Sequence, residues 1–203
     1  MKGTALRHAA VGAGILILAA TGATALLVWH RDPVAENGPL SIGDESAFAS
    51  CVLEPTDQRH VAWAPLMVYN ETDTPVTLDS VELTDPVDIT LVDGHLIPWI
   101  NNGIANGQWL PPSADDESVR PADLDNWAAR KVIGSPEAVV QKKGDGWQLA
   151  LEIDLPKENL GYSHGFAIYY HSDSGKRYVA RSDTWVGVGS EKQPCADWEA
   201  PEE

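Results

Sequence analysis

The stretch WQLALEIDL, residues 147–155, decides the fold class. Its first residue and every second residue after it are apolar, whereas three of the four residues between them are polar. A period of two over nine residues predicts a β-strand with one buried face and one solvent-exposed face. Turn-forming residues 142–146 precede this strand, so we expect residues 138–141 to pair with it in a hairpin.

Apolar segments elsewhere in the chain predict further strands. Residues 165–181 predict a second hairpin, with its turn at residues 172–175. Residues 61–69 are apolar on both faces, as in a central strand. Shorter strands are expected over residues 76–83, 87–92 and 96–100. About seven strands with few helical periods predict a mainly β chain, built as a single antiparallel β-sandwich over residues 48–196.

Two interruptions of the β-pattern stand out. The apolar positions change parity between Leu78 and Val81, which predicts a β-bulge between these residues. Residues 101–136 form a long insertion with a short helix expected over residues 122–130. An insertion of this length in a compact domain is often functional.

The N-terminal segment predicts a membrane anchor. Residues 9–29 are 21 uncharged, mostly apolar residues, long enough to span a bilayer as one helix. Lys2 and Arg7 precede this segment, so residues 1–8 are expected in the cytoplasm and the remaining chain outside. The alternative is a signal peptide cleaved after the small residues 23–25. We favour the uncleaved anchor, because cleavage there would leave an exposed apolar N-terminus.

The charge of the chain excludes a basic nucleic-acid-binding protein. The chain has 30 acidic and 14 basic residues, a net charge of −16. All 30 acidic residues follow Arg31, whereas only 11 of the 14 basic residues do. The exported part therefore carries a net charge of −19. Such a charge repels nucleic acid and favours solubility, cationic partners or divalent ions. An acidic flexible tether is expected over residues 30–47 and an acidic tail over residues 197–203.

The two cysteines, Cys51 and Cys195, lie at the two ends of the expected sandwich. In an oxidising extracytoplasmic compartment such a pair predicts one disulfide. Neither cysteine has the C-x-x-C spacing or the nearby histidine of a reactive or metal-binding thiol pair. We therefore expect the first and last segments of the domain to meet.

The strand, turn, strand pattern of residues 68–83 resembles that of immunoglobulin-like and fibronectin-type modules in bacterial surface proteins. The layout of anchor, tether and module is also similar to that of small membrane-anchored proteins of high-GC Gram-positive bacteria. The resemblance implies a fold and a location, and it transfers no site residue. The cysteines are too far apart in sequence for the inter-sheet bridge of antibody domains.

Tryptophans and acidic residues of the insertion form the first candidate binding surface. Aromatic side chains stack on sugars and also dominate protein interfaces, so exposed tryptophans favour a protein or cell-envelope ligand. The tryptophans in or beside the insertion and the acidic triplet within it are Trp99, Trp109, Trp127, Asp115, Asp116 and Glu117. The triplet lacks the alternating spacing of a calcium loop.

Histidines offer a second candidate site. His164, His171 and Asp173 carry ligands for a divalent metal, but residues seven apart in one strand meet only if the chain folds back. The nearby pentapeptide GYSHG, residues 161–165, matches the nucleophile motif of α/β-hydrolases without the strand-to-helix turn that this motif requires.

These features predict a non-enzymatic binding or envelope-accessory protein, anchored by one helix with its domain outside the cytoplasmic membrane. The alternative is an extracytoplasmic metal-binding domain, and a hydrolase comes third. No motif implies a cofactor.

Overall fold

The computed structural model describes residues 34–43, 49–53, 60–141, 146–154, 160–190 and 192–198. The chain divides into two units, residues 1–31 and 32–203, and all described residues belong to the second. The expected membrane anchor, residues 9–29, lies outside the described residues. Within the described ranges, no helix is long and apolar enough to cross a membrane.

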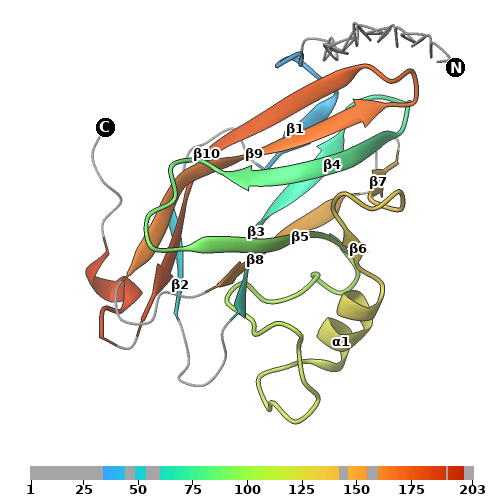
Figure 1. The fold of residues 1–203 in the computed structure, drawn as a ribbon. Coiled ribbons are helices and arrows are strands. Elements are labelled where there is room, and N and C mark those ends of the chain that lie inside the picture. The colour runs from blue at the N-terminus through green and yellow to red at the C-terminus, as the bar shows by residue number, and fades with distance from the viewer. Residues whose placement is uncertain are drawn as a thin grey trace, which may run out of the picture. The chain divides into compact units, whose positions relative to one another are not determined.

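The described residues form two five-stranded sheets. We call the first sheet I; its strands, in spatial order, are β1 (Leu40–Ile42), β3 (His60–Asn70), β8 (Trp147–Asp154), β5 (Thr90–Pro98) and β6 (Lys131–Val132). Sheet II consists, in spatial order, of β2 (Ala49–Leu53), β10 (Arg177–Gly189), β9 (Gly161–Ser172), β4 (Val76–Leu83) and β7 (Val139–Val140). Figure 1 shows the long strands of the two sheets as two layers. The predicted mainly β sandwich is confirmed.

The strand order is that of an immunoglobulin-like sandwich. Lettered A to G in chain order, the strands β1, β3, β4, β5, β8, β9 and β10 give the order ABED in sheet I and GFC in sheet II. These are the two sheets of a constant-type immunoglobulin domain. The neighbouring strands pair antiparallel, except that β2 runs parallel to β10.

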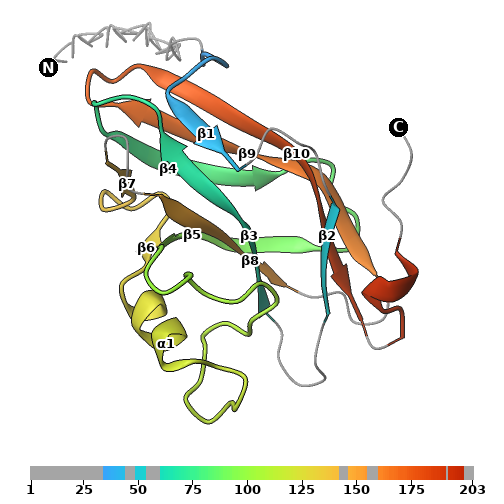
Figure 2. The same cartoon turned by 180° about the vertical axis from the view of Figure 1, so that it is seen from behind.

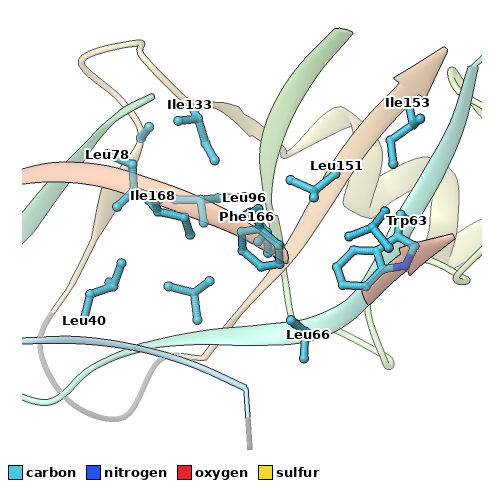
Figure 3. Close-up of a cluster of buried hydrophobic side chains, with 14 of the residues drawn as sticks. Leu40, Trp63, Leu66, Leu78, Leu96, Ile133, Leu151, Ile153, Phe166 and Ile168 are labelled. Carbon is cyan, nitrogen blue, oxygen red and sulfur yellow. The ribbon is translucent and has the colours of Figure 1, made fainter. Parts of the chain in front are cut away.

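The main hydrophobic core fills the space between the sheets (Figure 3). The apolar row that opened the sequence analysis supplies Leu149, Leu151 and Ile153, all without exposed surface. Trp63 of β3 lies edge-on to Phe166 of β9, with ring centroids 5.8 Å apart. Strands from both sheets therefore meet through large side chains, which bury most apolar area per residue.

The first half of the outer face of β8 is covered, contrary to the prediction from its alternation, whereas the Asp154 side chain is 40% exposed. Gln148 and Ala150 are buried, because the insertion packs against this face of sheet I. A second, smaller apolar cluster fills that contact: Ala62, Ala64, Ile97, Ile104, Leu110 and Ala150, with Trp127 at its margin. Figures 1 and 2 show the insertion and α1 (Pro121–Ala128) beside sheet I, away from sheet II. The expected helix over residues 122–130 is confirmed within two residues.

One predicted strand pairing and one predicted division into two strands are wrong. Residues 139–140 form β7, which pairs with β4 of sheet II and not with β8. The two short strands expected over 87–92 and 96–100 are one strand, β5, which pairs along its length with β8. The second predicted hairpin is confirmed as β9 and β10, and the bulge is confirmed by a register shift between Leu78 and Ser80.

Part of the segment expected to be a free tether belongs to the sandwich. Strand β1 lies within residues 30–47 and pairs with the end of β3, Leu40 opposite Asn70. Ala35 forms a further bridge with Tyr178 of β10. The segment lacked a recognisable strand period because only three of its residues pair in β1, too few to show alternation.

The predicted disulfide is confirmed. Cys51 on β2 is bonded to Cys195 in the 3₁₀ helix η1 (Cys195–Asp197), with Cα atoms 5.7 Å apart. The bond joins residues separated by 144 positions and fixes the C-terminal segment beside β2. It does not link the two sheets as in antibody domains, since β2 and the segment after β10 both belong to the sheet II side.

Replacing both cysteines with serine should lower the free energy of unfolding by about 2 to 5 kcal/mol, because a long closed loop restricts the unfolded chain. Urea unfolding of the full chain, followed by tryptophan fluorescence, measures the change. An unfolding midpoint equal to that of the oxidised wild type would contradict this expectation.

Candidate functional site

The loop that follows β5 has an unusual backbone. Asn101, Asn102 and Gly103 are three consecutive residues with positive φ, at 51°, 70° and 61°. Positive φ is uncommon outside glycine, and each such residue persists only where its surroundings hold it. The neighbouring structure must therefore fix residues 99–103, which we call the Trp99 loop.

Asn126, on the buried face of helix α1, and Arg120, directly before the helix, hold the Trp99 loop. The Asn126 amide donates hydrogen bonds to the carbonyls of Ile100 (2.7 Å) and Gly103 (2.8 Å). Arg120 donates a further bond to the Gly103 carbonyl (3.1 Å). Asp123, which has no exposed surface, orients this guanidinium from one helical turn away and accepts a bond from the Arg120 backbone N–H. The Asp123 carboxylate raises the pKa of Arg120 above its ordinary value.

Gln148 of β8 holds the other end of the loop. Its Oε1 accepts a hydrogen bond from the backbone N–H of Ile104 (2.8 Å), and its Nε2 donates to the carbonyls of Ala64 (2.7 Å) and Ile104 (2.9 Å). The Gln148 side chain is buried, and both of its polar atoms are satisfied. Residues 99–104 are therefore fixed to sheet I at one end and to α1 along their length.

The loop presents the most exposed large apolar side chains of the described residues. Ile100 is 59% exposed and Trp99 is 48% exposed. Tyr69 of β3 is 39% exposed, and its ring lies against Gly146. The residues before Tyr69 and Trp99, Val68 and Pro98, both pair with Trp147, one from each side. We call Tyr69, Trp99 and Ile100 the apolar patch. Strand spacing puts the backbones of Val68 and Pro98, the residues before Tyr69 and Trp99, about 10 Å apart.

The other predicted tryptophans do not join this surface. Trp109 is 7% exposed and pairs through its backbone with Val61. Trp127 is half-buried between His95, whose ring it meets edge-on at 4.8 Å, and the Arg130 guanidinium, 4.1 Å from its ring centre. Of the three tryptophans, only Trp99 is exposed as the hypothesis of a binding surface requires.

The acidic triplet forms no shared ligand set. Asp116 accepts hydrogen bonds from the hydroxyl (2.7 Å) and backbone N–H (2.8 Å) of Ser118, which lower the pKa of its carboxyl group. Asp115 and Glu117 are exposed beside it. Within the described ranges, no group of three histidine, cysteine or acidic side chains converges on a metal position.

The histidine trio predicted as a metal site is not brought together. His171 is 2.7 Å from the Asp79 carboxylate, whereas His164 stacks on Trp185 at 4.4 Å. Asp173 is exposed in the turn after β9. Ser163 of the GYSHG motif is buried within β9 and donates to backbone carbonyls of Thr84 and Gly165.

Sequence reasoning missed a second cluster, formed by two other histidines around one carboxylate. His60 Nδ1 lies 2.8 Å from Glu152 Oε1, and His95 Nε2 lies 2.9 Å from Glu152 Oε2. His95 is 3% exposed, and its Nδ1 has no hydrogen-bond partner among the described residues. The cluster spans β3, β8 and β5 on the outer face of sheet I, so only strand pairing reveals it.

Replacing Glu152 with alanine should lower the free energy of unfolding by about 1 to 3 kcal/mol, since the buried His95 N–H would lose its acceptor. Urea unfolding of the full chain measures the loss. The matched control is Glu137→Ala, which removes an exposed pair with Lys131 and should change stability by less than about 0.5 kcal/mol. Equal losses in the two variants would count against the role given to Glu152.

Replacing Asn126 with alanine should loosen the Trp99 loop without unfolding the domain, because the carbonyls of Ile100 and Gly103 lose a shared donor. Hydrogen exchange of the Gly103 amide, which bonds to the Ile100 carbonyl, should accelerate by about tenfold or more. Asp125→Ala, on the exposed side of the same helix, is the control and should leave this exchange unchanged. Unchanged exchange in both variants would show that Asn126 does not fix the loop.

No family model and no curated protein sequence matches the chain. A comparison with solved structures finds a Vibrio cholerae protease, VesB, at 8% identity and a TM-score of 0.33, covering 74% of this chain. This chain spans only 31% of the length of that protease.

Two smaller domains also match. The N-terminal domain of PorA matches at 15% identity and a TM-score of 0.34, covering 76% of this chain and 98% of that domain. The ASH/PapD-like domain 7 of human CEP192 matches at 11% identity and a TM-score of 0.33, covering 78% of this chain and 90% of that domain. At TM-scores this low, the three likenesses support no inference about this chain.

Proposed function

We propose that this chain is a non-enzymatic binding protein whose immunoglobulin-like domain docks a protein partner through the apolar patch. One observation carries the proposal: the two most exposed large apolar side chains of the described residues lie on a loop held by hydrogen bonds from the buried Asn126 and from Arg120. Exposed large apolar groups that are clustered mark interaction sites more often than single ones do.

The energetics of protein interfaces favour this arrangement. A few aromatic or branched side chains supply most of the binding free energy at an interface, and they act best from a rigid base. A side chain on a preorganised loop loses less conformational entropy on binding than one on a free loop. The positive φ of Asn101 and Asn102 is the cost of that preorganisation, offset within the free protein by the bonds that Arg120 and Asn126 donate to the loop.

The proposed location is the outer face of the cytoplasmic membrane, with residues 9–29 as a single-pass anchor and the N-terminus inside. The uncharged length of this segment and the basic residues before it support the orientation. The disulfide gives independent support, because stable disulfides form mainly in extracytoplasmic compartments. The net charge of −19 beyond the anchor favours a partner with basic groups around its apolar contact.

Site-specific photocrosslinking in cells that express the full chain tests the proposal. A photoreactive residue at position 69, 99 or 100 should crosslink to one discrete protein, whereas the same residue at Val92, 44% exposed on the same sheet, should not. The Asn126→Ala change, which leaves the patch residues in place, should reduce the yield at position 99. Equal yields at positions 92 and 99, or no protein adduct at any patch position, would contradict the proposed docking.

A further inference from the structure

A cavity of about 630 Å³ lies at the end of the sandwich where three separate segments meet. These are residues 37–39 before β1, the turn between β3 and β4, and the turn between β9 and β10. Figures 1 and 2 show the two turns at the same end of the molecule, and Val76 pairs with Ser172 there. The volume falls within the range of small-molecule sites, about 300 to 1,000 Å³.

Hydrogen bonds inside the described chain fix the cavity walls. The Glu71 N–H donates to the Pro39 carbonyl (2.8 Å), which joins the β3–β4 turn to the segment before β1. The Asn70 amide donates to the Thr74 carbonyl (2.8 Å) and shapes the turn itself. The Leu40 N–H donates to the hydroxyl of Tyr170, whose ring stacks on Tyr178 at 5.3 Å. The cavity is therefore preformed.

The lining combines several hydroxyl groups with a larger share of apolar surface. Four aliphatic hydroxyls, one phenol, one amide and one carboxylate line it, together with apolar surface from two further side chains: Thr72, Thr74, Ser172, Ser174, Tyr178, Asn37, Glu71, Pro39 and Val76. Gly38 completes the wall, and among the described residues no lysine or arginine lines it, although Lys176 Nζ lies 4.9 Å from the centre of the Tyr178 ring. The Ser172 and Ser174 hydroxyls lie 2.9 Å apart, and either can donate.

The donor and acceptor balance of this lining selects a class of ligand. A hydroxyl both donates and accepts, so it is matched by a molecule that carries hydroxyls itself. The Glu71 carboxylate can only accept hydrogen bonds, and the Ser41 hydroxyl donates one to its Oε1 (2.9 Å). The negative charge of this carboxylate disfavours an anionic ligand. Peptide recognition by strand addition would instead need an open sheet edge, and the turns that line this cavity provide none.

We propose that this cavity binds a neutral carbohydrate of one to a few sugar rings. This inference goes beyond the proposed protein docking and does not depend on it, because no residue of the apolar patch lines the cavity. A glycan site and a protein-docking patch at the same end of β3 suit a protein that connects an envelope glycan to a partner.

Saturation-transfer NMR on the full chain tests the site, with cellotriose, maltotriose and chitotriose as neutral probes at about 10 mM, enough to populate sites of millimolar affinity. At least one neutral trisaccharide should show transfer. The Thr74→Trp variant, which fills the cavity from an exposed turn position, should weaken that binding by about tenfold or more. Thr90→Trp, also exposed but on β5, is the matched control and should bind as wild type.

Glucose 6-phosphate and a Gly-Ser-Gly tripeptide distinguish the alternatives. Glu71→Gln should raise the affinity for glucose 6-phosphate and leave neutral binding in place, because it removes only a charge. Absence of transfer to all three neutral trisaccharides would overturn the proposal, as would binding that survives in a folded Thr74→Trp variant. Binding of the tripeptide alone would assign the cavity to peptides and refute the carbohydrate class. A thermal melt of each variant establishes that it is folded.

Discussion

The buried side-chain amide of Gln148 joins the insertion to the sandwich, and the position of the exposed Trp99 loop depends on it. Its two polar atoms make three hydrogen bonds, two to the backbone of Ile104 and one to that of Ala64. A buried polar group that loses its partner costs about 1 to 3 kcal/mol, so displacing the insertion would leave several such groups unpaired. The insertion therefore has one preferred position on sheet I. This position also fixes the Trp99 loop, which directly precedes Ile104.

The contact between the insertion and sheet I is held largely by polar groups. Its apolar cluster is small and contains three alanines, whereas the main core contains many large side chains. Gln148 supplies directional bonds across this contact, and Arg120 and Asn126 supply them between α1 and the Trp99 loop, which adds the specificity that packing alone would not. This explains how three consecutive residues remain in the left-handed region beside Trp99, since bonds to the carbonyls on both sides determine the path of the loop.

Part of the candidate surface could be predicted from sequence. The position of Trp99 beside the long insertion predicts a binding role for it. Trp109 has the same predicted role but is buried. Its burial could not be predicted, because composition does not report which side of a loop faces the sheet. Tyr69 and Ile100 looked like ordinary strand residues. Glu152 lies 92 residues from His60 and 57 from His95, so their contact exists only after three strands have paired.

The sequence by itself determined the β class, the hairpin of β9 and β10, the bulge in β4 and the partner of each cysteine. These features follow from local periodicity, local turn chemistry or the presence of only two thiols. The tertiary structure decided that residues 139–140 pair with β4 and that the first half of the polar side of β8 is covered. An apolar period of two residues predicts which side chains share a face of the strand. What covers that face depends on packing between segments far apart in the chain.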